Sequence, residues 1–379
     1  MEGRSRRAAG DRPRRPGSHV RGAAMKARAA APDLLISELE SARRFLQRAV
    51  DPVPEALWAE QPSPTYSPIG WHLGHVASMQ SRWLLPGEPQ QYGPLFDPRA
   101  TAKTSRLRLP SPYELRVWLD DVLERVCAGL RAGRIPGILG LPETFLVQNV
   151  AQHELQHAEH VQVIAALCEK RLHRMPPVLR VRAANRLELP GGRLTVGSTD
   201  SARAYDNEQP PHAIELRPFW LDRTPVTAGE FATFVQDGGY REARHWIAEG
   251  WAWRKRHDVR APLALQEQQP DAPVTCLSWY EADAYARWRG ARLPTEHELE
   301  AARVEPAGVW EWTSSWFLPY PGFRPYPYEG YSVPWFGTHR VLRGGSWATS
   351  PELLRPSLRN WYEPGVREIP SGLRCAGGM

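Results

Sequence analysis

Residues 146–168 read LVQNVAQHELQHAEHVQVIAALC and contain neither glycine nor proline, so they predict one uninterrupted helix of about six turns. Apolar side chains recur at steps of three and four residues, which is typical of a helix with a buried face. His153 and His157 fall on that face, one turn apart. The apolar residues around them predict that both imidazoles lie inside the protein.

Two histidines four residues apart lie about 40° from one another around a helix, because each residue turns the chain by about 100°. Two buried imidazoles would each need a separate partner, whereas one metal ion satisfies both. The spacing therefore makes a metal site a candidate beside two hydrogen-bonded core histidines, and this motif alone does not decide between them. His160 falls near the same face, as a rival ligand or a neighbour of the ligands. Glu159 points elsewhere, which favours a structural role or contact with a ligand over metal binding.

The whole chain has 379 residues, of which 42% are hydrophobic, so we expect two domains with buried cores. No run approaches the roughly 18 apolar residues of a membrane helix. The net charge of +6 is concentrated in the arginine-rich residues 1–32, which predict a disordered tail, with Met25 as an alternative start of translation. This tail lacks an apolar targeting segment and aromatic residues for base stacking, so we expect no binding to membranes or nucleic acid.

The cysteines are too scattered to form a recognisable site. Cys127, Cys168, Cys276 and Cys375 include no CxxC pair, which disfavours both a zinc knuckle and a disulfide framework. A reducing, cytoplasmic setting fits this usage best.

Three further segments have helical periodicity, at residues 34–50, 69–85 and 111–131. Together with residues 146–168 they predict an all-α, four-helix domain over residues 33–175. Metal sites in such bundles are built from side chains on facing helices.

The second of these helices can supply a third metal ligand. Ser67 and Pro68 stand in the order expected at its N-cap and first turn. His72 and His75 lie beside its apolar stripe, and periodicity places His72 nearer the centre. Spacing alone does not decide between these two histidines.

The string SPIGWHLGH at residues 67–75 and the HxxxHxE pattern at residues 153–159 carry a resemblance. Together they resemble the DinB-type helical domain of the nonheme-iron sulfoxide synthases of ergothioneine biosynthesis. The resemblance implies that His75, His153 and His157 hold Fe(2+). Three neutral imidazoles leave positions open for O₂ and a thiolate, and zinc with a hydrolytic water is the rival.

Residues 176–185 predict a linker, after which short segments are punctuated by glycine and proline. Residues 186–379 therefore predict a loop-rich α+β domain, with helices at 227–235 and 278–289. Six strings there resemble, in order, the formylglycine-generating-enzyme-like module with its C-type-lectin-like fold. They are YDNE (205–208), PFWLDR (218–223), PVTCLSW (273–279), RLPTE (292–296), VWEWT (309–313) and LRGGSW (342–347).

One departure from that module changes the expected chemistry. Formylglycine-generating enzymes need a cysteine pair shortly after the RGGS string, and residues 347–355 contain no cysteine. Oxidation of a peptide cysteine is thereby disfavoured. What the resemblance implies instead is a sulfoxide synthase, whose second domain covers the iron site and binds hercynine, the trimethylated histidine.

The resemblance also implies substrate-binding and catalytic residues. The string RNWY contains Asn360 and Trp361, which match residues that lie against hercynine. An aromatic face suits a quaternary ammonium, and a core role for Trp361 is the alternative. Tyr328 and Tyr331 match the place of a proton-donating tyrosine in some synthases, with a surface aromatic turn as the alternative.

Recognition of the sulfur donor is where the sequence departs from the family. Arg106 lies in a basic loop, and the resemblance implies that arginines of this region, and Arg367 farther on, can meet the donor carboxylate; an ordinary solvated connection is the alternative for the loop. Synthases that use γ-glutamylcysteine carry an acid just after RNW and arginines farther on, whereas this chain has Tyr362, Val366 and a single Arg367. Residues 303–309 are also short, so any contact made there by a longer excursion is absent. Free cysteine or another sulfur or selenium donor becomes plausible.

The sequence thus predicts a two-domain, Fe(II)- and O₂-dependent enzyme that forms a C–S bond between hercynine and a thiol, cysteine or γ-glutamylcysteine. A synthase of the selenoneine type and a non-catalytic lectin-like binding protein are the rivals. A binding protein has no use for three convergent imidazoles. Sequence alone leaves the oligomeric state open.

Overall fold

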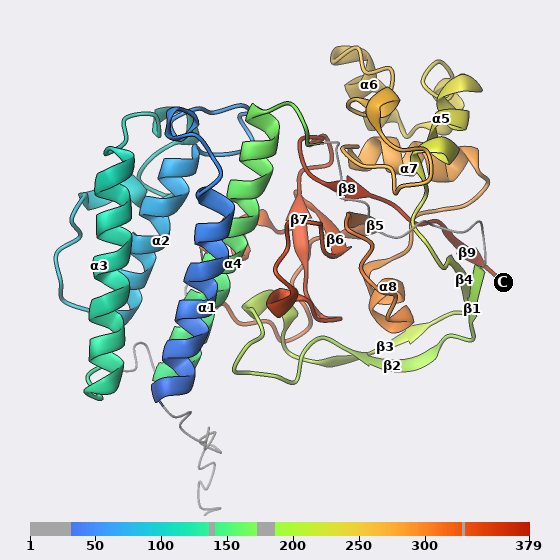
Figure 1. Ribbon diagram of the computed structural model, residues 1–379. Helices are drawn as coiled ribbons and strands as arrows, with labels where there is room; N and C mark the ends of the chain where they lie inside the picture. The colour runs from blue at the N-terminus through green and yellow to red at the C-terminus, as the bar shows by residue number, and fades with distance from the viewer. Residues whose placement is uncertain (1–31, 136–140, 173–185, 328–329) are drawn as a thin grey trace, which may run out of the picture.

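The computed structural model describes residues 32–135, 141–172, 186–327 and 330–379. Its N-terminal part is a bundle of four helices (Figure 1). They are α1 (Pro32–Val50), α2 (Ile69–Leu84), α3 (Pro112–Arg131) and α4 (Glu143–Cys168). Each of the four predicted helices is present, and the ends differ from the predicted ends by three residues or fewer. Within the described ranges no helix is long and apolar enough to cross a membrane.

The predicted basic tail falls outside the described residues, except for Pro32, which begins α1 and so belongs to the helix. The predicted linker at residues 176–185 also lies outside them.

The N-cap predicted at Ser67 is wrong. Pro68 occupies the N-cap of α2 and the helix has no side-chain cap. The Ser67 hydroxyl instead accepts a hydrogen bond of 2.7 Å from the Arg106 guanidinium. A bond from a charged donor is stronger than a cap to a backbone amide, so the side chain turns away from the helix.

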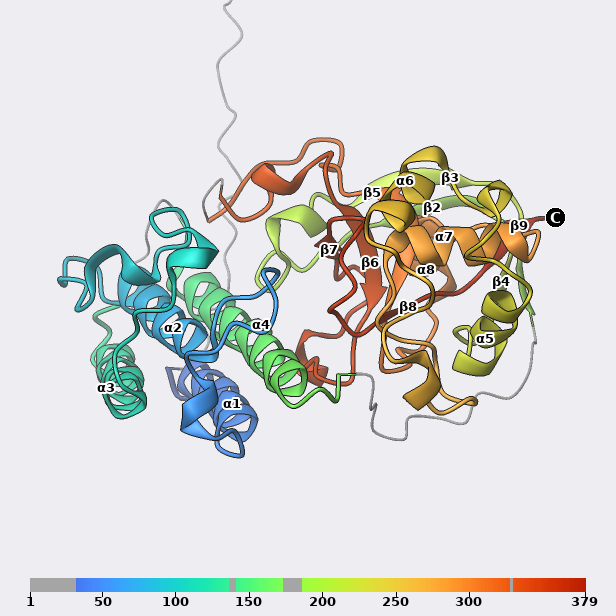
Figure 2. The ribbon, with the colours of Figure 1, turned by 90° about the horizontal axis from the view of Figure 1, so that it is seen from above.

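Helix α4 is buried on more sides than the single predicted face. On the bundle side Glu154 is fully buried, 2.6 Å from Arg43 on α1 and 2.5 Å from Gln80 on α2. On the opposite side Gln162 donates to the carbonyl oxygen of Ala348 in the second domain, at 3.1 Å. Figures 1 and 2 show α4 between the other helices and that domain. It therefore serves both cores.

The second domain combines small sheets with short helices, as predicted for an α+β domain. The first sheet is antiparallel, in the order β1 (Arg186–Leu189), β4 (Phe219–Asp222), β9 (Ala376–Gly378). The second is the hairpin of β2 (Gly192–Val196) and β3 (His212–Leu216). The third has the order β7 (Asn360–Tyr362), β6 (Arg340–Gly344), β5 (Trp310–Trp316), β8 (Ser371–Gly372), with β8 parallel to β5.

Among the described residues of this domain four helices flank the sheets, and the sequence predicted two of them. They are α5 (Ala228–Gln236), α6 (Ala248–Arg256), α7 (Trp279–Trp288) and α8 (Glu296–Ala302). Capping boxes start three of them, at Thr227, Ser278 and Thr295. Helices α6 and α8 were not predicted, because α6 has no apolar stripe and α8, with 7 residues, is too short to show periodicity.

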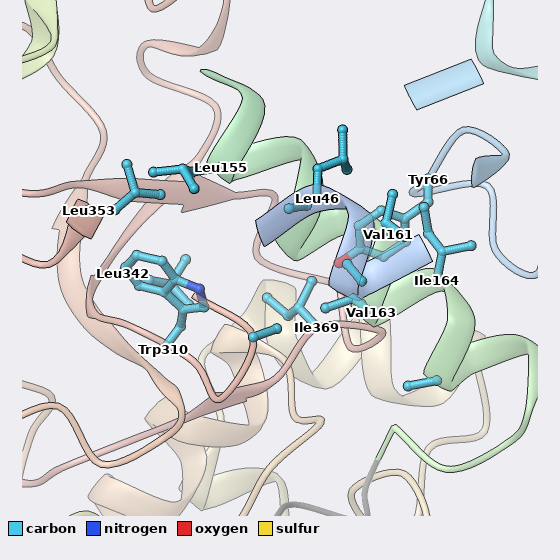
Figure 3. Close-up of a cluster of buried hydrophobic side chains, with 14 of the residues drawn as sticks. Leu46, Tyr66, Leu155, Val161, Val163, Ile164, Trp310, Leu342, Leu353 and Ile369 are labelled. Carbon is cyan, nitrogen blue, oxygen red and sulfur yellow. The ribbon is translucent and has the colours of Figure 1, made fainter. Parts of the chain in front are cut away.

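One hydrophobic core runs through both parts of the molecule. Figure 3 shows Leu155 of α4 beside Leu353 and Val163 of α4 beside Ile369, and Leu46 of α1 belongs to the same cluster. Tyr66, from the loop before α2, lies beside Val161 and Ile164. A shared core holds the bundle against the sheet domain, so a site between them can be shaped by both.

Candidate metal centre and active site

Three imidazoles converge where α2 passes α4. His75 comes from α2, and His153 and His157 come from successive turns of α4. The Nε2 atom of His153 lies 3.2 Å from Nε2 of His75 and 3.0 Å from Nε2 of His157. One ligand atom from each of the three lies within 4.8 Å of the others. These are the three residues that the resemblance implied as ligands, and metal binding by them stays a prediction.

The spacing of these nitrogen atoms fits one metal ion. Two nitrogens bound at about 2.05 Å are about 2.9 Å apart at a right angle and about 3.3 Å apart in a tetrahedron. The separations of 3.0 and 3.2 Å lie between these limits. Without a cation, the three nitrogen atoms would face one another with too few N–H protons for each to form a hydrogen bond. The donor set therefore suits a divalent transition metal.

The surroundings of His75 fix its orientation. Its Nδ1 donates a hydrogen bond of 2.7 Å to the carbonyl oxygen of Phe96, which leaves the Nε2 lone pair for a metal. Trp71 stacks on the imidazole at 4.7 Å with an interplanar angle of 10°, and Arg106 lies over the indole at 4.0 Å. Each contact restrains the ring, as is usual around a ligand.

The site keeps its imidazoles neutral. Burial lowers the pKa of His75 to about 4, although the hydrogen bond to the Phe96 carbonyl acts in the opposite direction and raises it. Burial also lowers the pKa of His153 and His157 well below the ordinary value, and the neighbouring imidazoles add to the effect. Neutral imidazole is the form that binds metals, so the free site is ready to accept an ion near neutral pH.

A second group of three histidines overlaps the first. His72, His157 and His160 also offer nitrogen atoms within 4.8 Å of one another. Nδ1 of His72 lies 2.7 Å from Nδ1 of His157. His72 therefore contacts His157 but does not belong to the first group. Periodicity had placed His72 nearer the centre of the apolar stripe than His75.

Glu159 connects the two parts of the molecule. Its carboxylate accepts hydrogen bonds from Trp310 Nε1 at 2.7 Å, Ser346 Oγ at 2.7 Å and Thr349 Oγ1 at 2.9 Å. The RGGS and VWEW strings thus provide the groups that anchor α4. These bonds give Glu159 a structural role, which its helical position favoured.

A hollow opens beside the metal centre, between α2, α4 and the second domain. Gln156 and Tyr331 meet across it, with Gln156 Nε2 donating to the Tyr331 hydroxyl at 3.1 Å. Burial raises the pKa of Tyr331 well above the ordinary value, so the phenol keeps its proton. The hollow is lined by Met79, Trp83, Asn149, Val150, His153, Gln156, Tyr205, Pro327 and Tyr331.

Of the two predicted hercynine-binding residues, Trp361 contacts a residue of this hollow, and neither Trp361 nor Asn360 is among the described residues that line it. Trp361 meets the ring of Tyr331 edge on, at 5.8 Å, and stacks on Phe317 at 4.2 Å. The Asn360 side chain accepts a hydrogen bond of 2.8 Å from the Trp361 amide. Tyr328, the other predicted catalytic tyrosine, lies outside the described residues. Substrate binding by Asn360 and Trp361 and proton donation by either tyrosine stay predictions.

The two predicted substrate-binding arginines have protein partners. Arg106 is 5% exposed and donates to Ser67 and to two loop carbonyls. Arg367 binds both oxygens of Glu281, at 2.9 and 3.0 Å, and also donates to the carbonyl of Ala261. Their role in donor binding stays a prediction. Arg106 also lies over Trp71, which stacks on His75.

Sequence reasoning missed three contributors to the site. Gln156 lies three residues after His153, so both side chains are on one side of the helix. This spacing could have indicated that Gln156 belongs to the site. Tyr205 stands in the YDNE string, which predicted fold alone. Tyr362 hydrogen-bonds Tyr66 across the domain boundary, and burial raises its pKa. No local sequence pattern predicts that pairing.

Both parts of the chain match known protein families. Residues 38–161 match the DinB superfamily, and residues 173–308 and 306–378 match the Sulfatase-modifying factor enzyme 1-like domain. The formylglycine-generating enzyme of Streptomyces coelicolor is 28% identical over 53% of this chain and 91% of its own. The solved structure of PvdO from Pseudomonas aeruginosa covers 51% of this chain and 94% of its own, at 21% identity and a TM-score of 0.35.

Relatives with both parts are more similar. The hercynine oxygenase of Mycobacterium tuberculosis is 34% identical over 91% of this chain and 99% of its own. The hercynine oxygenase of Mycolicibacterium smegmatis is 33% identical over 91% of this chain and 98% of its own. The chain belongs to the hercynine oxygenase family, and is an oxidoreductase with a DinB-like helical region followed by an α+β domain of the sulfatase-modifying-factor type.

Proposed function

We propose that the protein is an Fe(II)- and O₂-dependent sulfoxide synthase of ergothioneine biosynthesis. It joins an imidazole carbon of hercynine to the sulfur of a small thiol, cysteine or γ-glutamylcysteine. The C–H and S–H bonds are replaced by a C–S bond and a sulfoxide oxygen, and the second oxygen atom of O₂ leaves as water. The observation that carries the proposal is the group of three neutral imidazoles beside an aromatic hollow, in a member of this family.

His75, His153 and His157 hold the metal in this proposal. Three neutral nitrogen ligands on one side suit an ion that must also bind substrates. Iron bound there would supply the redox chemistry that activates O₂. The Phe96 carbonyl holds the tautomer of His75, and Trp71 holds its ring, so this ligand is oriented before the metal arrives.

The hollow takes hercynine. Tyr331 lines the hollow and offers its ring to the quaternary ammonium, which cannot take part in a conventional hydrogen bond, and Trp361 packs edge on against Tyr331. The Gln156 amide can exchange its bond to Tyr331 for one to the substrate imidazole. The Tyr331 phenol is protonated near neutral pH, so it can give a proton to oxygen as the new bond forms.

The residues that follow the RNW string favour a small sulfur donor without a second carboxylate to be bound. Arg367 is held by Glu281, and Tyr362 is turned toward Tyr66. Neither is available for a second carboxylate of the donor without losing a buried contact. Cysteine is therefore the first donor to test, with γ-glutamylcysteine beside it.

Oxygen uptake by the full-length protein, loaded with Fe(II) under anaerobic conditions, tests the proposal. Uptake should require both hercynine and a thiol, and His153→Ala should abolish it. His257→Ala removes an exposed histidine in the second domain and should leave the rate unchanged. Uptake without hercynine, or an active His153→Ala protein, would contradict the proposal. Zinc loading that supports turnover as well as iron would assign hydrolytic chemistry instead.

A further inference from the structure

The contact between His72 and His157 acquires a direction once His157 holds a metal. Nε2 of His157 is the nitrogen that converges with His153, at 3.0 Å. A ligand nitrogen presents its lone pair, so the proton of a neutral imidazole sits on the other nitrogen. Nδ1 of His157 therefore carries the proton, and it points to Nδ1 of His72 at 2.7 Å. His157 donates and His72 accepts.

The His72 ring is oriented so that Nδ1 contacts His157 while Nε2 is left without a hydrogen-bond partner among the described residues. Accepting at Nδ1 places the proton of His72 on Nε2, and this atom has no hydrogen-bond partner among the described residues. The residue is 4% exposed, so water does not compensate freely. A histidine that only filled space would gain by turning Nε2 toward an acceptor. This ring is turned to His157 instead.

The nearby carboxylates are committed elsewhere. Histidine ligands usually donate their second N–H to a carboxylate, a backbone carbonyl or a water molecule. Here Glu154 is engaged by Arg43 and Gln80, and Glu159 by the second domain. His75 uses the Phe96 carbonyl, so His157 is the ligand whose second N–H meets another imidazole.

We infer that His72 is a positioning residue for the metal centre. Its Nδ1 accepts the Nδ1–H of His157, which fixes the tautomer and ring orientation in which His157 binds the ion. The inference rests on the metal centre proposed above. It differs from the alternative in which His72, His157 and His160 bind an ion of their own, because that alternative makes His72 a ligand.

Two amide variants separate these roles. In His72→Asn the side-chain oxygen can stand near the position of Nδ1 and accept the same bond. In His72→Gln the oxygen lies one carbon farther out, and the acceptor is misplaced. Both variants keep a buried polar group. His160→Asn is the matched control, because His160 packs against His157 without a hydrogen bond.

The measurement is titration of metal-free, full-length protein with Co(II), followed by visible absorption and by competition with a chelator. We expect one Co(II) per chain. Loss of such a contact typically weakens metal binding about 10- to 100-fold, which is the effect expected for His72→Gln. His72→Asn and His160→Asn should bind like wild type. In the Zn(II)-loaded protein, nitrogen-15 NMR should find His157 protonated at Nδ1, and His72→Gln should speed exchange of that proton.

The possible results have distinct meanings. Equal affinity of His72→Gln and wild type would overturn the inference and leave the metal centre standing. His72→Asn as weak as His72→Gln would overturn the hydrogen-bond explanation. Two Co(II) ions per wild-type chain, one of them lost in both His72 variants, would make His72 a ligand. No Co(II) binding by wild type would overturn the proposed metal centre and this inference together.

Discussion

Glu159→Ala should loosen the contact between α4 and the second domain. The carboxylate accepts three hydrogen bonds, two of them from Ser346 and Thr349, which also bond to each other at 3.1 Å. These hydroxyls therefore keep a partner in the variant. The indole N–H of Trp310 has Glu159 as its acceptor and would be left buried and unsatisfied.

The expected loss of stability follows from these contacts. An unsatisfied buried donor costs about 1–3 kcal/mol, and the lost side-chain volume adds about 1 kcal/mol. Burial raises the pKa of Glu159, so desolvation of the carboxylate already offsets part of its hydrogen bonding. Before that offset the two costs sum to about 2–4 kcal/mol, so we expect a net loss of about 2–3 kcal/mol, or roughly 3–4 °C in Tm for a chain of this length.

Glu159→Gln keeps an acceptor for the indole and should lose only about 1 kcal/mol. Glu124→Ala, on the exposed face of α3, is the matched control and should stay within about 0.5 kcal/mol of wild type. Differential scanning calorimetry of the metal-free, full-length proteins measures all three. A Glu159→Ala protein that melts within about 2 °C of wild type would refute the anchoring role.

Three further perturbations test the packing around the site. Arg43→Met leaves Glu154 buried without its cation and should lower the free energy of unfolding by about 3–5 kcal/mol, which a urea titration measures; an unchanged midpoint would contradict this. Gly74→Ala places a Cβ 2.2 Å from the Phe96 ring, so it should cost about 1–3 kcal/mol and weaken Co(II) binding through the displaced carbonyl; wild-type affinity would contradict it. Burial raises the pKa of Asp206 to about 6, so its contribution to stability is present at low pH and lost as pH rises through that value. The free energy of unfolding of Asp206→Asn, relative to that of wild type, should therefore rise by about 2–3 kcal/mol between about pH 4 and about pH 8. A difference between the two proteins that does not change with pH would contradict the raised pKa.

The bundle could be predicted from the sequence because its helices are long and periodic. Residues 146–168 kept their helical character over every turn, and α4 extends three residues farther toward the N-terminus. What periodicity could not predict is that α4 is buried on opposite sides. The partners of Glu159 lie 151 to 190 residues away in the chain, so no local pattern indicates them.

The cluster of His75, His153 and His157 was predictable from the sequence only in part. Spacing placed His153 and His157 together, since their separation is fixed by the helix itself. It did not separate His72 from His75, because the choice depends on how α2 is rotated against α4. The resemblance favoured His75, and the structure gives His72 a contact that neither argument predicted.

The hollow could not be predicted from local sequence patterns for the same reason. Gln156 and Tyr331 are 175 residues apart, and their hydrogen bond forms only when the two domains pack. Trp361 was singled out by its string, yet its stacking on Phe317 depends on the packing of residues outside that string. Sequence strings indicated which residues to consider, and tertiary packing decided their neighbours.

The central claim is that the three-histidine centre drives oxidative C–S bond formation on hercynine. Its most direct test is mass spectrometry of the products when the Fe(II)-loaded protein turns over hercynine and cysteine under ¹⁸O₂. The account predicts a hercynine–cysteine sulfoxide that carries one ¹⁸O atom and is absent with His153→Ala. Hercynine recovered unchanged with every thiol tested, or a sulfoxide formed equally by His153→Ala, would contradict it.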